Sequence, residues 1–243
     1  MSFLKPTFWQ IPIIHLEKNG LADKTTALKQ RLHHIAESHR NARFASSLAV
    51  EDMVITDVIA REGLNIGIFT LDTGLLHQET LDLLDNLGRT YPNIHIERFQ
   101  PIQADAEHYV EEKGKYAFYE SVELRRECCH IRKIEPLNRA IKGADAWLTG
   151  QRREQSATRT ELPFAEADKA RGIDKYNPIF DWSETDVWTY ILANNVPYND
   201  LYHQGFPSIG CDPCTRQVKE GEDIRAGRWW WENKDSKECG LHK

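Results

Sequence analysis

Two cysteine pairs constrain the fold of this chain more than any other feature. Cys128 and Cys129 are adjacent, and Cys211 and Cys214 form a Cys-x-x-Cys motif that begins 82 residues after Cys129. A fold that brings the pairs together creates a cage of four thiolates, which suits Zn²⁺ or an iron–sulfur cluster. Adjacent cysteines converge poorly on one zinc ion, whereas a [4Fe–4S] cluster offers separate iron corners. The pattern therefore favours the cluster, with two buried structural pairs or a redox dithiol as alternatives.

Composition and charge indicate a globular protein of a reducing cytoplasm. Hydrophobic residues make up 40% and charged residues 28% of the 243 residues, which is typical of soluble domains. No apolar run reaches the roughly 20 residues that cross a bilayer, and residues 1–7 show no secretory signal. The five cysteines follow no disulfide framework. The net charge of −6 argues against general binding to nucleic acid, so we expect neither nucleic acid nor a membrane as partner.

Apolar segments alternate with amphipathic segments through most of the chain. Leu28, Leu32 and Ile35 have helical spacing, for example, whereas short continuous apolar runs predict buried strands. The alternation predicts an α/β fold with a mostly parallel, twisted sheet flanked by helices. The polar residues 151–175 predict an ordered loop or lid. The predicted strands are 43–45, 66–71, 94–99 and 146–149, and the predicted helices are 52–62, 76–87, 104–142 and one that starts with a capping box at 183–186.

Polar turns follow three of the predicted strands, and ligands of doubly wound sheets bind at such strand ends. The first turn places hydroxyl groups at a helix start, which favours an anion, although ordinary helix capping explains them equally well. The third turn and Arg159 offer arginines for a phosphate or sulfate, or simply a solvated face. Together the turns favour a nucleotide or another multiply anionic ligand. They are residues 46–52, 71–74 and 150–153.

The C-terminal end carries the fifth cysteine, Cys239, among basic neighbours that favour its thiolate form. A residue so close to a chain end has few neighbours to bury it. The sequence therefore predicts a nucleophile that moves between a buried substrate and an external partner; an incidental exposed cysteine is the alternative. Arg225 and Arg228 lie upstream, where they can reach an anion together with the tail. We expect one domain at 1–225, which binds nucleotide and cluster, and a flexible catalytic tail at 226–243.

These motifs resemble the assimilatory sulfonucleotide reductases, and within them the cluster-containing adenylyl-sulfate (APS) reductases of the PAPS reductase family. The resemblance covers about residues 30–243. It implies a fold of the adenine-nucleotide α-hydrolase type, related to ATP pyrophosphatases. The turn at 46–52 lacks the glycines with which those relatives approach a pyrophosphate, which disfavours ATP cleavage. The motifs that carry the resemblance are 46–52, 71–74, Cys128-Cys129, 150–156, 211–214 and 238–242.

The resemblance implies reduction of APS to sulfite and AMP, in sulfate assimilation and cysteine biosynthesis. Cys239 would attack the sulfur of APS and carry an S-sulfonate, from which thioredoxin or glutaredoxin would release sulfite. Members that use only the 3′-phosphorylated substrate (PAPS) typically lack the cysteine pairs. The implied [4Fe–4S] ligands are Cys128, Cys129, Cys211 and Cys214, and the implied substrate-binding residues are Ser46, Leu71, Thr73, Lys133, Gly150, Arg159, Arg225, Arg228 and His242.

Two other functions stay open at this point. A PAPS reductase, or one that accepts both substrates, needs a cationic contact for the 3′-phosphate that the sequence does not place. A zinc-stapled nucleotide- or RNA-binding protein would contain zinc, no sulfide and no colour; the acidic net charge and the terminal cysteine argue against it. A homo-oligomer is compatible with each of these functions.

Overall fold

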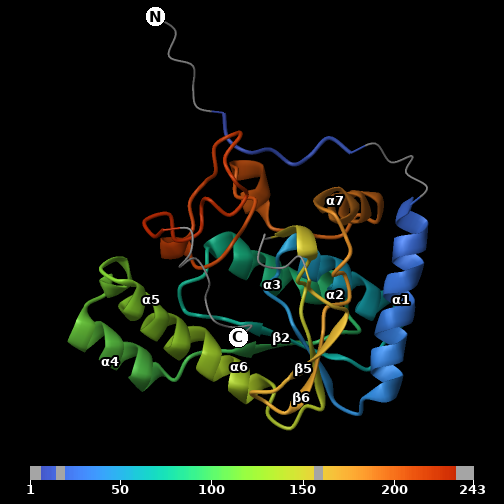
Figure 1. Cartoon of the computed structure of the whole chain (residues 1–243), viewed down its shortest axis with the longest axis horizontal. Coiled ribbons are helices and arrows are strands. Elements are labelled where there is room, and N and C mark those ends of the chain that lie inside the picture. The colour runs from blue at the N-terminus through green and yellow to red at the C-terminus, as the bar shows by residue number, and fades with distance from the viewer. Residues whose placement is uncertain (1–6, 15–19, 156–160, 234–243) are drawn as a thin grey trace, which may run out of the picture.

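Six strands form one sheet in the computed structural model, which describes residues 7–14, 20–155 and 161–233 (Figure 1). The strand order is β3-β2-β1-β4-β6-β5, and neighbouring strands are parallel except for β5, which pairs antiparallel with β6. The predicted α/β fold with a mostly parallel sheet is therefore confirmed. The strands are β1 (Ala42–Ala45), β2 (Gly67–Leu71), β3 (Ile96–Phe99), β4 (Ala146–Leu148), β5 (Ala165–Asp168) and β6 (Ile173–Tyr176).

Helices cover both faces of the sheet because successive side chains of a strand point to opposite faces. Leu148 of β4 belongs to a hydrophobic core shared with α1, α2 and α7, whereas its neighbour Trp147 packs with α6 on the other face. Figure 1 shows α4, α5 and α6 grouped on one side of the molecule, away from α1. In the described part of the chain, no helix is both long and apolar enough to span a membrane. The helices are α1 (Gly20–Ser38), α2 (Val50–Glu62), α3 (Gln78–Thr90), α4 (Gln103–Lys113), α5 (Val122–Cys129), α6 (Glu135–Ala140) and α7 (Glu184–Ala193).

Several of the predicted helix boundaries are observed. Gly63 ends α2 in the left-handed conformation, with φ of 61°, and Ser183 and Asp186 form the predicted capping box of α7. The predicted helical stretch 104–142 contains α4, α5 and α6. A π-helical turn (His130–Ile134) separates α5 from α6. Such turns are frequent at functional sites, and this one directly follows the first cysteine pair.

The prediction of a loop or lid at 151–175 is wrong. Apart from 156–160, which lie outside the described residues, this segment carries β5 and most of β6. β5 is an edge strand in which exposed alanines alternate with partly buried acidic residues, so it lacks the apolar run that marks a buried strand. Lys175 of β6 is buried because it pairs with Glu166 of β5 at 2.9 Å. A polar contact between the strands therefore helps to hold this hairpin, and such a contact leaves no apolar pattern in the sequence from which a strand could be predicted.

Candidate active site

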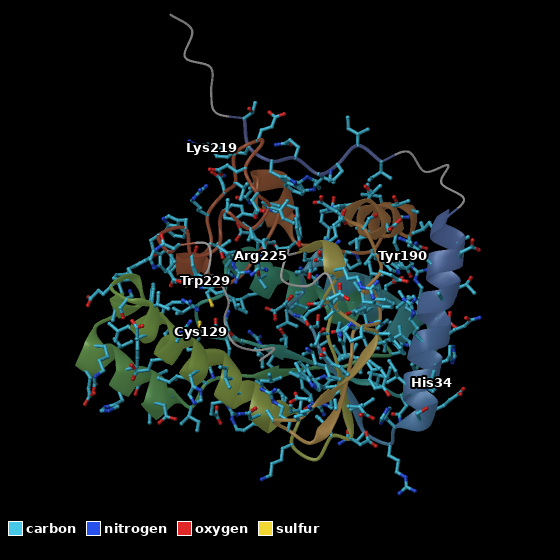
Figure 2. The ribbon with its side chains drawn as sticks, in the orientation of Figure 1. His34, Cys129, Tyr190, Lys219, Arg225 and Trp229 are labelled. Carbon is cyan, nitrogen blue, oxygen red and sulfur yellow. The ribbon has the colours of Figure 1, made fainter. Side chains whose placement is uncertain are left out.

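A cavity of about 250 Å³ lies at the carboxyl ends of β1, β2 and β4. β2 and β3 lie on one side of β1 and β4 lies on the other. The crevice beyond β1 is thus a topological switch point, the place where open α/β sheets bind ligands. Residues 207–211 and several residues between 224 and 229 form the opposite wall. Figure 2 labels Arg225 and Trp229, which belong to this wall.

Seven of the nine predicted substrate-binding residues line this one cavity. They come from three strand ends, from the π-helical turn and from the C-terminal part of the chain, which are far apart in the sequence. Their roles in binding remain predictions. Arg159, His242 and the predicted nucleophile Cys239 lie outside the described residues. The seven lining residues are Ser46, Leu71, Thr73, Lys133, Gly150, Arg225 and Arg228.

The turn after β1 is held by its own side chains. Ser47 donates from its N–H and from its hydroxyl to Oδ2 of Asp52, at 2.6 and 2.5 Å. The N–H of Leu48 donates to Oγ of Ser46 at 3.3 Å, and Leu48 adopts a φ of 64° with its side chain buried. A residue other than glycine in this conformation costs about 1 kcal/mol or more. Helix capping does not explain Ser47, because the N-cap of α2 is Ala49 and the start of the helix has no side-chain cap, whereas the Ser47 hydroxyl donates to Asp52.

Asp52 joins the turns that follow β1 and β4. Besides its bonds from Ser47, its carboxyl group accepts a hydrogen bond from the N–H of Gly150. A Cβ atom at position 150 would lie 3.1 Å from Cγ of Asp52 and closer still to Oδ1, so this approach requires glycine. Burial raises the pKa of Asp52 from 3.8 to about 7, although the bonds from Ser47 act in the opposite direction. The cavity is therefore lined by a carboxyl group that titrates near neutral pH.

Asp52→Asn is expected to remove a pH dependence of stability. The folded protein keeps this proton up to about pH 7, whereas the unfolded chain releases it near pH 3.8. Protonated Asp52 stabilises the folded protein fully below the pKa that Asp52 has in the unfolded chain. This stabilisation, about 4 kcal/mol in total, is lost as the pH rises through the pKa that Asp52 has in the folded protein. The free energy of unfolding in urea, measured between about pH 4 and about pH 8, should fall more steeply for the wild type than for Asp52→Asn. Equal slopes would show that Asp52 has an ordinary pKa.

Arg152 and Arg153 are not among the residues that line the cavity. Arg152 is buried and donates from Nε and Nη2 to Oε1 of Glu51, at 3.2 and 2.8 Å. Its Nη1 donates to the carbonyl oxygen of Trp182. The guanidinium of Arg153 lies over the ring of Phe180, 4.6 Å from its centroid. These contacts hold the loop after β4 in place, and they argue against the interpretation of the two arginines as phosphate or sulfate ligands.

Three cationic side chains, Lys133, Arg225 and Arg228, line the cavity on the side of the cysteines. Arg228 is largely buried, with its guanidinium 4.8 Å from the centroid of the Trp229 ring. Lys133 comes from the π-helical turn, and it lies close enough to the cysteines to act on their pKa values. It therefore stands between the cavity and the cysteines. Cations at this place attract an anionic ligand.

The two cysteine pairs lie together, as predicted. Cys128 and Cys129 end α5, whereas Cys211 and Cys214 flank a short 3₁₀ turn, and all four side chains are buried. Burial raises the pKa of the Cys128 thiol to about 11 and that of Cys214 to about 12. A cysteine of the other pair raises each of these two pKa values further. Four thiols thus share one region between α5 and residues 211–214.

The four thiols and their surroundings fit an iron–sulfur cluster. Within the described ranges, the four thiols are in no disulfide, and no three side chains of His, Cys, Asp or Glu are arranged as ligands of one ion. Sulfur ligands with hydrogen-bond donors around them suit an iron–sulfur cluster. The hydroxyl of Thr73 lies 3.3 Å from Sγ of Cys211, and Arg125 donates a hydrogen bond to the side chain of Cys129.

Residues 226–233 pack against both cysteine segments. The N–H of Trp229 donates to the carbonyl oxygen of Cys214 at 3.1 Å, and Thr215 and Arg228 form an antiparallel bridge. The side chain of Trp229 is buried. The division of the chain at residue 225 remains a prediction, but the described part of the predicted tail is packed onto the domain.

The family of this chain follows from comparison with known proteins. Residues 41–217 match the family model described as the phosphoadenosine phosphosulfate reductase domain. The chain belongs to this family.

Two of the relatives of this chain are named adenosine 5′-phosphosulfate reductase. The protein of Neisseria meningitidis serogroup A is 77% identical over 244 residues, covering 100% of both chains. The protein of Allochromatium vinosum is 50% identical, over 94% of this chain and 89% of the relative. A solved structure, the phosphoadenylyl-sulfate reductase of Candida auris in complex with phosphate, aligns with a TM-score of 0.65 and 25% identity, over 84% of this chain and 100% of that one. These similarities confirm the fold and the family that the motifs predict.

The sequence predictions missed two charged residues of this reductase-family site, Asp52 and Arg125. Asp52 belongs to the motif at 46–52, but its contact with Gly150 depends on the pairing of β1 with β4. Arg125 precedes Cys129 by four residues, so helical spacing places both on one face. This spacing is the signal by which the sequence indicates that Arg125 lies beside Cys129.

Proposed function

We propose that this chain reduces adenosine 5′-phosphosulfate (APS) to sulfite and AMP, as a thiol-dependent oxidoreductase of sulfate assimilation and cysteine biosynthesis. The observation that carries the proposal is the meeting of seven predicted binding residues around one cavity beside Cys211. The cavity lies where α/β sheets bind nucleotides, and its cationic side suits a phosphosulfate. The names of the relatives at 77% and 50% identity support APS as the substrate.

The proposed roles divide the cavity into a nucleoside side and an anion side. The strand ends offer backbone groups and small polar side chains for the nucleoside, whereas the cations near the cysteines neutralise the phosphosulfate. Residues on the nucleoside side are Ser46, Leu71, Thr73 and Gly150, and those on the anion side are Lys133, Arg225 and Arg228, joined by Arg159 and His242.

Cys239 is the proposed nucleophile. Its thiolate attacks the sulfur of APS, so that an S–S bond forms while the S–O bond to the phosphate breaks and AMP leaves with the electron pair. A thiolate of thioredoxin or glutaredoxin then attacks Sγ of Cys239 and releases sulfite. The second thiol of this partner resolves the mixed disulfide. The partner's dithiol thus supplies both electrons of the reduction.

We assign a [4Fe–4S] cluster to Cys128, Cys129, Cys211 and Cys214. Their burial and their two-segment arrangement support the assignment, because separate iron corners accommodate neighbouring thiolates. The cluster would supply a fixed charge next to Lys133, while its ligands hold α5 beside residues 211–214. A reducing cytoplasm keeps such thiols available for iron.

Cys214→Ser is expected to lose most of the iron and acid-labile sulfide that anaerobically purified wild-type protein contains. A serine hydroxyl is a poor ligand for this soft site, so the visible absorption of the cluster should fall in parallel. Thr215→Ser is the matched control, because it leaves all four thiols in place and keeps a hydroxyl that can donate to the carbonyl oxygen of Cys211. Wild-type protein with zinc and no sulfide would contradict the cluster assignment.

The reaction is tested by the intact mass of the protein after anaerobic incubation with APS and no reductant. A sulfonate adduct on the wild type, absent from Cys239→Ser and discharged by reduced thioredoxin with release of sulfite, is the expected result. PAPS is the second substrate to test, since the matching family and the Candida auris structure carry its name. An adduct with PAPS alone would overturn the choice of substrate. No adduct with either, on protein that contains the cluster, would exclude Cys239 as nucleophile.

A further inference from the structure

A buried ion pair links α5 to the C-terminal segment. Nε and Nη2 of Arg125 donate to the two carboxylate oxygens of Glu232, at 2.7 and 2.9 Å. The two side chains are only 1% and 3% exposed, so water contributes little to their solvation. Such a pair of parallel hydrogen bonds fixes both orientation and distance. Glu232 is thereby held against a helix 107 residues away in the sequence.

The same guanidinium group contacts the first cysteine pair. Arg125 lies one helical turn before Cys129 on α5, and it donates a hydrogen bond to the Cys129 side chain. Its Cζ atom also lies 4.7 Å from the centroid of the Trp229 ring. One buried cation therefore touches a proposed cluster ligand, an aromatic ring that lines the cavity, and the carboxylate of Glu232.

We propose that Arg125 is a positioning residue that couples cluster ligation at Cys129 to the docking of residues 226–233. A buried cation is stabilised only while its anionic partners are present, and removal of one partner leaves an uncompensated charge. A cluster-bound Cys129 is a thiolate and Glu232 is a carboxylate. Each of these anions stabilises the Arg125 guanidinium in the position where it also pairs with the other anion. Because such coupling is reciprocal, loss of the cluster loosens the segment, and release of the segment loosens the cluster. The inference rests on the proposed cluster.

This coupling bears directly on the proposed nucleophile. Cys239 follows Glu232 by seven residues, a length of chain that spans at most about 25 Å. Anchoring Glu232 beside α5 limits the volume that Cys239 can explore, and a smaller volume that includes the cavity raises its effective concentration there. A protein without its cluster would lose this anchor, and with it the placement of the nucleophile.

Glu232→Gln tests the coupling because it keeps the size of the side chain and removes only its charge. Two rates are measured on the holoprotein: hydrogen exchange of a peptide covering 226–233, and loss of iron to a chelator, followed by the visible absorption of the cluster. Both should rise by about tenfold or more, since loss of one member of a buried ion pair is strongly destabilising. Removal of the cluster from the wild type should accelerate exchange of the same peptide. Faster exchange with unchanged iron loss would overturn the coupling.

Two controls separate coupling from general destabilisation. Asp57→Asn removes a buried carboxylate of α2 that accepts from Tyr91 and Tyr190, so it lowers stability and should leave both rates unchanged. The pair Arg125→Met with Glu232→Met replaces the ion pair by apolar groups, which often restores stability. In this double variant, cluster removal should no longer accelerate exchange at 226–233, and persistent acceleration would overturn the role of Arg125. Iron and sulfide are measured in the wild-type protein before any variant is compared. Their absence would refute the cluster assignment itself.

Discussion

Replacing Cys239 with serine is expected to lower sulfite formation from APS by roughly four to six orders of magnitude, the loss that follows removal of a covalent nucleophile. The thiolate is the reactive form of cysteine and is accessible at neutral pH, whereas a serine hydroxyl keeps its proton and lacks the polarizable sulfur. The reductant must attack a sulfur atom at this position, so both half-reactions fail together. Sulfite release with excess reduced thioredoxin measures the effect.

The affinity of the cavity for AMP and the iron content provide the controls for the Cys239→Ser variant. Cys239 is assigned to the chemical step and not to nucleotide binding, so the variant should bind AMP with the affinity of the wild type. It should also retain the iron content of the wild type. Sulfite formation within about tenfold of the wild-type rate would exclude the proposed mechanism, because the residual catalysis after loss of a nucleophile is far smaller.

Gly150→Ala is expected to lower kcat/KM for APS by roughly two orders of magnitude, the cost of a displacement of about 1 Å at a reacting site. The added methyl group would lie 3.3 Å from Cβ of Glu51 and press against the carboxyl group of Asp52. The turns after β1 and β4 must then separate, and the hydrogen bond from the N–H of Gly150 to Asp52 is strained. Overpacking of this kind costs about 1–3 kcal/mol of stability, which urea unfolding measures.

Gly88→Ala is the matched control for Gly150→Ala. Gly88 lies in α3, where an added Cβ meets no atom within 4 Å, so the substitution should be neutral or stabilise the protein by up to about 1 kcal/mol. Combining Gly150→Ala with Asp52→Ser removes Oδ1 of Asp52, the atom that the added methyl group would approach most closely. This double variant should recover part of the lost kcat/KM, and failure to recover any would place the cause outside the Asp52 contact.

Most of the fold could be predicted from the sequence because its central strands are buried on both faces. β1, β2 and β4 present short apolar runs, and the helices between them have apolar positions at helical spacing. β5 and β6 were missed because each strand has four residues, two of them charged, so neither shows a continuous apolar run. A strand that is stabilised by cross-strand polar pairs carries no apolar signature.

The sequence by itself determined which chemistry is available to this protein. Four of its cysteines occur in two pairs, its strand-end motifs place small and polar residues where a nucleotide binds, and its family follows from these motifs together. A residue type at a given spacing has the same chemistry wherever the chain folds, so such features can be recognised without coordinates.

Only the tertiary structure decided which charges are available to a ligand. Arg152 is neutralised by Glu51, 101 residues away, whereas Arg228 lines the cavity. Asp52 acquires a pKa of about 7 from burial, and Arg125 meets Glu232 only in the folded protein. The energy of a charge depends on its solvation and on its neighbours, and for these residues both are set by segments that are distant in the sequence.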